Sequence, residues 1–267
     1  MQKQRTLLVA NWKMAPTRLR DAAKILRDLE PAAKQSAGVD IWVAPPALFL
    51  APLQNEFGHS FTFGLQDASA EREGGFTGEI SSLMAKDMGA AFTILGHSER
   101  KRLGETTALT NRKVKAALAA GLKVILCFGE SNRPRELSAK HMAPTWQAEL
   151  KQLLRNISSL SYKLKAKSSL FLAFEPAWAI STHSSLRSSG QALRKVYPER
   201  MRGAPPAYLE DFLAWYRKHY RFPVLYGGSV DGTIIKTYHD LRFDGYLIGA
   251  ASRKPKEFSK IIKTIAN

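Results

Sequence analysis

The sequence predicts an α/β protein that folds as one closed (β/α)8 barrel. Eight short apolar runs, rich in β-branched or aromatic residues, recur along the 267 residues, and each is followed by a stretch with helical patterning. This alternation is typical of a parallel sheet, because parallel strands need crossover connections. No low-complexity linker divides the chain. Eight successive units therefore favour a closed barrel over two doubly wound domains, which the length alone would also allow.

The strands are predicted from apolar runs that are bounded within a residue or two by polar residues, glycine or proline. In chain order they cover residues 7–10, 41–44, 61–65, 92–95, 124–127, 170–174, 223–226 and 246–248. The first intervening helix is predicted over 18–34, because apolar residues recur there at helical spacing, at positions 19, 22, 23, 26 and 29. Further helices are predicted over 110–120, 145–154 and 255–265. The prediction is a single domain over residues 1–267.

Polar, ionisable and glycine residues gather where the predicted strands end. In such barrels the chemistry collects at the carboxyl ends of the strands, whereas the other face serves stability. The exits carry Asn11-Trp12-Lys13, Gln66-Asp67, Gly96-His97-Ser98-Glu99, Phe128-Gly129-Glu130, Glu175, Gly227-Gly228-Ser229 and Gly249-Ala250-Ala251-Ser252. We therefore expect the functional site at this end of the barrel.

Glu175 ends the apolar run 170–174 and is followed by a stiff proline. A carboxylate half out of water at the mouth of a core is a candidate general base, because desolvation raises its pKa toward the operating pH. The alternative is a carboxylate held by a neighbouring Lys or Arg at a strand end. Taken alone, that ion pair is the more common arrangement, so the rest of the chain has to decide.

Small residues at the last two strand exits indicate a phosphate site. Gly227, Gly228 and Ser229 follow the seventh strand, and Gly249 with Ala250 follows the eighth. Backbone N–H groups can approach a ligand closely there, and the loops after strands seven and eight form the phosphate site in barrels of this kind. One Gly-Gly pair alone would only make a tight strand exit, but two adjacent small-residue exits favour phosphate.

His97 and Lys13 are the other candidates for chemistry. His97 lies between a strand and a helical segment, where the positive end of a helix dipole disfavours the imidazolium form. A neutral imidazole can donate a hydrogen bond to a developing oxyanion, although a lone histidine is more often a local cap. Lys13 is either a solvated surface lysine or a fixed positive charge for an enediolate oxygen or the phosphate.

The chain shows no sign of a metal or a cofactor. The six histidines are scattered, and no pair stands at the i,i+4 spacing of a metal site. No Gly-x-Gly-x-x-Gly follows the first strand, which argues against a dinucleotide site. The single cysteine, Cys127, excludes an intrachain disulfide and is interpreted as a small core residue in a reducing compartment. The apolar run 7–10 is too short for a signal peptide and no stretch is long enough to cross a bilayer, so we expect a soluble cytoplasmic protein without membrane contact.

The chain carries 40 Lys plus Arg against 23 Asp plus Glu, a net charge of +17. Such a field attracts anions of every kind, including phosphorylated metabolites and nucleic acid. Most basic clusters lie in helical patterns, which indicates solvated outer faces. No basic motif rich in aromatic residues stands out, so any binding of nucleic acid is expected to be non-specific.

At these residues the chain resembles the triosephosphate isomerase family over essentially its whole length. The resemblance rests on five motifs in family order at successive strand exits: Asn11-Trp12-Lys13, Ile94-Leu95-Gly96-His97-Ser98-Glu99-Arg100, Cys127-Phe128-Gly129-Glu130, Glu175-Pro176-Ala177-Trp178-Ala179-Ile180 and Tyr226-Gly227-Gly228-Ser229-Val230. Each motif alone is weak, but five in order are highly specific.

The resemblance implies interconversion of dihydroxyacetone phosphate and glyceraldehyde 3-phosphate through an enediolate, with no cofactor. It makes Glu175 the base and His97 the neutral electrophile, a pairing that is the family's established one. It also makes Lys13 a source of positive charge and Asn11 a positioning group, with Glu99 close to both.

The resemblance also implies a phosphate site, a lid and a homodimer. The phosphate site would comprise Ser181, Ser229, Gly227, Gly228, Gly249 and Ala250. Closure of the loop after Glu175 would exclude water from the enediolate. Thr77, in the long third loop, would insert beside the active site of a second copy.

Three departures from the family pattern concern the lid and the phosphate site. Ser181-Thr182-His183 stands where the family usually has Gly-Thr-Gly, and Ser184-Ser185-Leu186 replaces the usual Lys-led second hinge. Ala250 adds a methyl group to the phosphate site. An enlarged segment over about 186–206 follows the lid. The alternative function is therefore a barrel that binds sugar phosphates with impaired turnover, with a basic surface as a further binding site.

Overall fold

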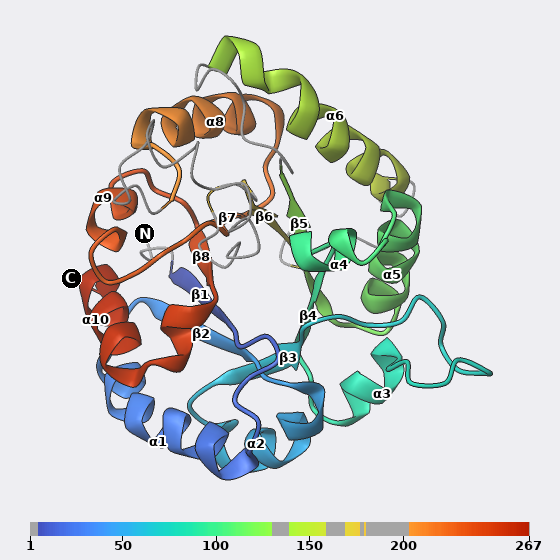
Figure 1. The fold of residues 1–267 in the computed structure, drawn as a ribbon, viewed down its shortest axis with the longest axis vertical. Helices are drawn as coiled ribbons and strands as arrows, with labels where there is room; N and C mark the ends of the chain where they lie inside the picture. The colour runs from blue at the N-terminus through green and yellow to red at the C-terminus, as the bar shows by residue number, and fades with distance from the viewer. Residues whose placement is uncertain (1–4, 130–138, 159–168, 177–178, 180–202, 267) are drawn as a thin grey trace, which may run out of the picture.

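A computed structural model describes residues 5–129, 139–158, 169–176, 179 and 203–266, and it contains a closed barrel of eight parallel strands (Figure 1). The strands are β1 Thr6–Asn11, β2 Val39–Ala44, β3 Thr62–Leu65, β4 Phe92–Leu95, β5 Lys123–Phe128, β6 Leu170–Phe174, β7 Val224–Tyr226 and β8 Gly245–Ile248. β8 closes the barrel against β1, with Leu8 opposite Tyr246. The predicted barrel and its eight strands are confirmed, and the predicted bounds differ by at most two residues.

The helices form a ring outside the strands (Figure 1). They are α1 Leu19–Gln35, α2 Leu50–Phe57, α3 Ser82–Asp87, α4 Ser98–Arg102, α5 Thr107–Ala119, α6 Ala139–Ser158, α8 Pro206–His219, α9 Ile235–His239 and α10 Pro255–Ala266, with short 3-10 turns η1 Ala47–Phe49 and η4 Ala250–Arg253. The predicted helix over 110–120 begins earlier, at Thr107. The reason is a cap, because the Thr106 hydroxyl accepts the N–H of Leu109 at 3.2 Å. The predicted helix over 145–154 is longer at both ends.

The strand residues alternate between two apolar layers. Leu7 and Val9 belong to the cluster inside the barrel, whereas Leu8 and Ala10 pack with the helices outside it. Cys127 lies fully buried in the inner cluster. Burial raises the pKa of its thiol, and the neighbouring Glu175 carboxylate raises it further. Cys127 is therefore a core residue with an unreactive thiol.

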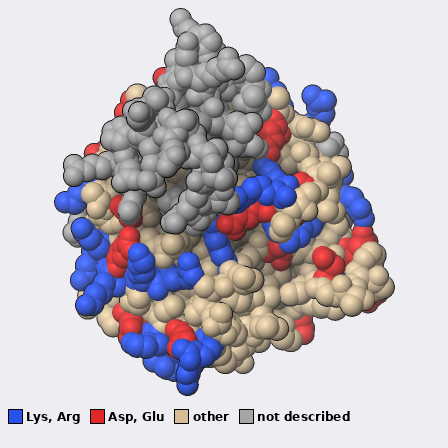
Figure 2. Space-filling model, viewed as in Figure 1, with Lys and Arg blue, Asp and Glu red and all other residues tan. Residues whose placement is uncertain are grey.

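Two surface features bear on the expectations from sequence. The loop between β3 and α3 projects from the barrel (Figure 1) and carries Thr77, which is exposed. Lys and Arg side chains are interspersed with Asp and Glu over the face seen in Figure 2. Within the described ranges no helix has both the length and the apolarity needed to span a membrane. The predicted enlarged segment lies outside the described residues up to position 202.

Candidate active site

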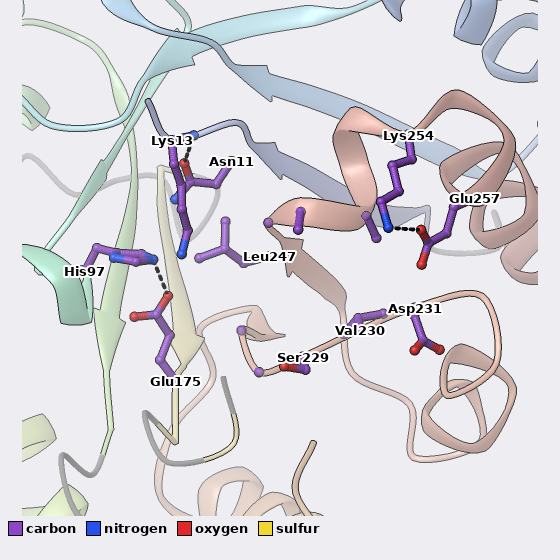
Figure 3. A pocket seen from close by; sticks show the side chains of 15 residues that line it. Asn11, Lys13, His97, Glu175, Ser229, Val230, Asp231, Leu247, Lys254 and Glu257 are labelled. Atoms are coloured by element: carbon purple, nitrogen blue, oxygen red, sulfur yellow. Dashed lines mark hydrogen bonds and ion pairs between the residues drawn. The ribbon is translucent and has the colours of Figure 1, made fainter. Parts of the chain in front are cut away.

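A cavity of about 150 Å³ opens at the carboxyl end of the barrel, where the exits of β1, β4, β6, β7 and β8 meet (Figure 3). Its lining includes nine residues that the sequence singled out: Asn11, Lys13, His97, Glu175, Gly227, Gly228, Ser229, Gly249 and Ala250. Lys13, His97 and Glu175 point toward one another (Figure 3). The fold thus gathers on one cavity residues that are up to 239 positions apart, from Asn11 to Ala250.

Glu175 is held at the bottom of this cavity. Its backbone N–H donates to the carbonyl of Phe128 at 2.7 Å, and the residue is 2% exposed. Carboxylate Oε2 accepts the backbone N–H of Ser98 at 3.1 Å. The other oxygen, Oε1, lies 3.3 Å from Nε2 of His97 but accepts no hydrogen bond of acceptable geometry from the residues that the structure describes. Within the described residues no Lys or Arg forms an ion pair with Glu175, so the strand-end ion pair does not occur there.

The ring of His97 is fixed in one orientation by the start of α4. Its Nδ1 accepts the backbone N–H of Glu99 at 3.1 Å, so this nitrogen carries no proton. A neutral ring then carries its hydrogen on Nε2, the atom that faces Glu175 across the cavity. His97 is therefore a hydrogen-bond donor aimed at the same space as the unpartnered oxygen of Glu175.

Lys13 adopts a backbone conformation that few residues tolerate. Its φ is 55°, in the left-handed region, which costs about 1–2 kcal/mol for a residue with a side chain. Two side-chain contacts hold it: its N–H donates to Asn11 Oδ1 at 3.0 Å, and its carbonyl accepts Gln66 Nε2 at 2.8 Å. The sequence analysis identified Gln66 only as a residue at a strand exit. Its hydrogen bond to Lys13 forms because the ends of β1 and β3 lie near each other in the barrel.

The ammonium of Lys13 is directed by Glu99. The two groups lie 2.7 Å apart. Burial alone would raise the pKa of Glu99, but the hydrogen bond and charge of Lys13, with the charge of Arg102, hold it below its usual value. Glu99 is therefore ionised at neutral pH and orients Lys13 without lining the cavity.

A buried ionic cluster lies beneath α4. Lys113 of α5, whose side chain is 3% exposed, contacts Asp67 at 2.8 Å and Glu105 at 2.5 Å, and Arg100 contacts Asp67 at 2.9 Å. Burial raises the pKa of Asp67 against the opposing effect of Lys113. Burial also acts to raise the pKa of Glu105, but the hydrogen bond and charge of Lys113 outweigh it and lower that pKa. The cluster ties the β3 exit to the helix that starts at His97.

The two glycines after β7 have neighbours that leave no room for a side chain. A Cβ on Gly227 would lie 2.7 Å from Cγ of Glu175, and one on Gly228 would lie 2.1 Å from the hydroxyl oxygen of Tyr226. From the sequence, we interpreted these glycines as positions where a ligand can approach the backbone closely. In the structure they also make room for the side chains of Glu175 and Tyr226.

The phosphate side of the cavity is more open. Gly249 and Ala250 begin the η4 turn, and Ala250 is exposed. The N–H of Ser229, expected from sequence to hold phosphate, donates to the carbonyl of Ala179 at 3.2 Å. This long bond leaves the N–H engaged, so it has to be released for a ligand. Ser181 lies outside the described residues.

Three charged residues at the far wall were missed by sequence reasoning. Lys254 and Glu257 form an ion pair of 3.2 Å at the mouth of the cavity. Asp231 accepts the N–H groups of Thr233 at 2.8 Å and Ile234 at 3.0 Å. All three lie two to five residues beyond the strand exits, which were the signal used. Within the described ranges no group of three or more His, Cys, Asp or Glu residues could hold a metal ion.

Comparisons with known proteins show which family this chain is similar to. A family model described as Triosephosphate isomerase matches residues 6–265. A triosephosphate isomerase of Coprinopsis cinerea is 35% identical over 254 residues, which cover 94% of each chain. One from Carboxydothermus hydrogenoformans is 33% identical, covering 97% of this chain and 98% of the relative. One from Endomicrobium trichonymphae is 32% identical, with 97% and 98% covered.

Proposed function

The chain belongs to the triosephosphate isomerase family and is an aldose–ketose isomerase, and we propose that Glu175, His97 and Lys13 carry out its reaction. The reaction interconverts dihydroxyacetone phosphate and glyceraldehyde 3-phosphate. No observation favours the alternative of a sugar-phosphate binder with impaired turnover.

The observation that supports the proposed roles most strongly is Oε1 of Glu175, which accepts no hydrogen bond from the described residues and lies 3.3 Å from Nε2 of His97. A buried carboxylate oxygen without a donor is costly, and here it faces the cavity beside a ring N–H. Glu175 removes a proton from the carbon next to the substrate carbonyl, and the electron pair moves to the carbonyl oxygen to form the enediolate. Glu175 then returns the proton to the neighbouring carbon, so no proton is gained or lost overall.

His97 and Lys13 stabilise the charge that develops on oxygen. Nε2–H of His97 donates to the carbonyl oxygen and exchanges protons between the two oxygens of the enediolate. The ammonium of Lys13 supplies a fixed positive charge, and Asn11, which supports the backbone of Lys13, helps to position the substrate. None of these steps needs a cofactor.

The phosphate group of the substrate is assigned to the opposite wall. Backbone groups of Gly227, Gly228, Ser229, Gly249 and Ala250 surround it. The support for this assignment is their place on the lining of the cavity that Glu175 also lines. Ser181 is proposed as a further donor from the resemblance alone.

A coupled assay with glyceraldehyde 3-phosphate tests the function. The unmodified chain is expected to turn over, and Glu175→Gln is expected to lower kcat by about 10²–10⁴-fold, the usual contribution of a general base. Glu56→Gln, which removes an exposed carboxylate on α2, is the matched control and is expected to leave kcat unchanged. Absence of turnover in the unmodified chain would contradict the function, and full activity of Glu175→Gln would contradict the assigned base.

We also propose a homodimer in which the loop carrying Thr77 meets a second copy. Phe76 on this loop is 48% exposed, and large apolar side chains are also exposed on other segments: Met14 is 93% exposed, Leu48 89%, Leu103 78% and Met84 55%. Such a concentration is typical of an interface. Met84→Glu is expected to shift the protein to a monomer in sedimentation, whereas Leu19→Glu on α1 is not. A monomeric unmodified protein would contradict the proposal.

The remaining proposals concern the surroundings of the enzyme. We place it in the cytoplasm, with the single buried cysteine as support. Binding of nucleic acid, if measured, is expected to vanish at moderate salt, since only the net charge would drive it.

A further inference from the structure

Two tyrosine hydroxyls hold the chain at Ala204, where it returns to the barrel before α8. The N–H of Ala204 donates to Oη of Tyr226 at 2.9 Å, and Oη of Tyr238 donates to the carbonyl of Ala204 at 2.7 Å. Tyr226 ends β7, and Tyr238 lies in α9. Ala204 is 2% exposed, Tyr226 0% and Tyr238 3%. A single residue is thus held by both of its backbone polar groups, away from water.

Both hydroxyls remain protonated at neutral pH. Burial raises the pKa of Tyr226 and of Tyr238 above the usual value. The two rings meet edge to face with their centroids 4.9 Å apart. The clamp on Ala204 is therefore made by two neutral hydroxyls on packed rings, of which Tyr226 accepts and Tyr238 donates, and it is insensitive to pH in the physiological range.

Gly203 connects this clamp to the phosphate side of the cavity. Its φ is +99°, and a Cβ at this position would lie 2.3 Å from Oη of Tyr238 and 3.2 Å from the carbonyl oxygen of Ser229. The glycine is therefore wedged between the tyrosine hydroxyl and the loop that follows β7. Gly203 thus lies between the residue that Tyr238 holds and the carbonyl of Ser229.

Residues from several segments of the chain lie next to the loop after β7. The N–H of Ser229 donates to the carbonyl of Ala179, and Gly227 packs against the side chain of Glu175. A Cβ on Gly203 would lie 3.2 Å from the carbonyl oxygen of Ser229, so these two residues are close neighbours. Glu175 and Ala179, which follow β6, and Gly203, which precedes α8, thus all lie next to this one loop, which lines the cavity.

We propose that Tyr238 is a positioning residue for the phosphate subsite, holding the loop after β7 in its binding shape through Ala204 and Gly203. Tyr238 does not line the cavity, and it acts only through these two residues. The proposal deepens the proposed function, on which it rests for the identity of the ligand.

The test is Tyr238→Phe, which removes only the hydroxyl that donates to the carbonyl of Ala204. Loss of one hydrogen bond is expected to raise both the KM for glyceraldehyde 3-phosphate and the inhibition constant of inorganic phosphate, each by about fivefold. We expect kcat to change by less than twofold, because the contact supports binding in the ground state and the transition state alike.

Tyr216→Phe is the matched control. The hydroxyl of Tyr216 also donates to a backbone carbonyl, that of Phe222 at 2.9 Å, and Tyr216 is 1% exposed. This bond lies ahead of β7, at the end of the barrel away from the cavity. The control is expected to lower Tm to a similar extent while leaving the KM and the inhibition constant unchanged.

The proposal is overturned if Tyr238→Phe lowers Tm as Tyr216→Phe does and leaves both constants within twofold. Gly203→Ala adds a methyl group that disturbs the contact of Gly203 with the hydroxyl of Tyr238. This variant provides the test if Tyr238→Phe does not fold. Its expected result is the same joint rise, and unchanged constants overturn the proposal. Calorimetric titration with inorganic phosphate gives the comparison without turnover, so an inactive unmodified chain would count against the proposed function alone.

Discussion

The two walls of the cavity are built differently. On the wall made by the exits of β1, β4 and β6, a specific short contact aims each functional side chain: Glu99 N–H for His97, Ser98 N–H for Glu175, and Glu99 for Lys13. Among the described residues, the wall made by the exits of β7 and β8 presents mainly backbone and small residues, together with the charged side chains of Asp231, Lys254 and Glu257. Proton transfer needs fixed side-chain atoms, whereas a phosphate group can be held by backbone N–H groups and net charge.

We call the wall made by the exits of β1, β4 and β6 the first wall, and the wall made by the exits of β7 and β8 the second wall. The contrast between them predicts that the first wall tolerates few substitutions. The largest effect is expected from Lys113→Met, which leaves the carboxylates of Asp67 and Glu105 buried beneath α4 with one cation fewer. Removing one partner of a buried ion pair costs about 3–5 kcal/mol in the free energy of unfolding. Denaturant unfolding measures this loss. Lys115→Met, on an exposed face of the same helix, should change stability by less than about 0.5 kcal/mol.

The second prediction concerns the donor on the first wall. His97→Gln places a flexible amide where a fixed ring N–H faces the cavity, and kcat is expected to fall by about 10²–10³-fold, as for the loss of one oxyanion donor. His59→Gln, at an exposed histidine, is the control. A loss confined to KM would show that His97 only binds, and the two walls would then not differ in kind.

The third prediction uses the pH dependence of stability. The folded-state pKa of Glu105 is lowered, so its contribution is present above the usual value of 4.5 and is lost as pH falls through the folded-state pKa. Glu105→Gln should therefore flatten the decline in the free energy of unfolding between about pH 5 and pH 3. The raised pKa of Asp67 acts in the opposite direction, with a contribution lost as pH rises. If the free energy of unfolding declines equally steeply with falling pH in the unmodified protein and in Glu105→Gln, Glu105 does not contribute to the loss of stability in acid.

The smallest effect is expected on the second wall. The side chain of Lys254 is 69% exposed and pairs with Glu257 at the mouth of the cavity. Lys254→Gln is expected to raise KM by about two- to fivefold, in the range of an exposed charge contact, with kcat unchanged. Lys256→Gln, two residues further on and outside the cavity lining, controls for net charge. A fall in kcat would place Lys254 in the chemistry and weaken the contrast.

Much of the first wall could be predicted from the sequence. Lys13, His97 and Glu175 each follow an apolar run within four residues, and parallel strands bring their carboxyl ends together. What the pattern did not reveal was their support. Gln66 holds Lys13 from another strand, and Ser98 donates to Glu175 across 77 positions. Such contacts depend on the register of the strands.

The second wall was predicted less completely. The small residues after β7 and β8 indicated phosphate, but the clamp of Tyr226 and Tyr238 on Ala204 follows from no local motif. Asp231, Lys254 and Glu257 lie beyond the strand exits, where helical residues are usually solvated. The packing of one loop on the next decided which of them face the cavity.

The sequence by itself determined the barrel, the end at which the site lies and the residue types available there, because strand and helix periodicity and strand exits are local properties of the chain. Only the tertiary structure decided that Nε2 of His97 faces Oε1 of Glu175 at 3.3 Å, that Lys13 has a positive φ, and that Gly228 makes room for Tyr226. The physical reason is closure of the barrel. Closure sets distances between residues that are remote in sequence, and local patterning does not constrain those distances.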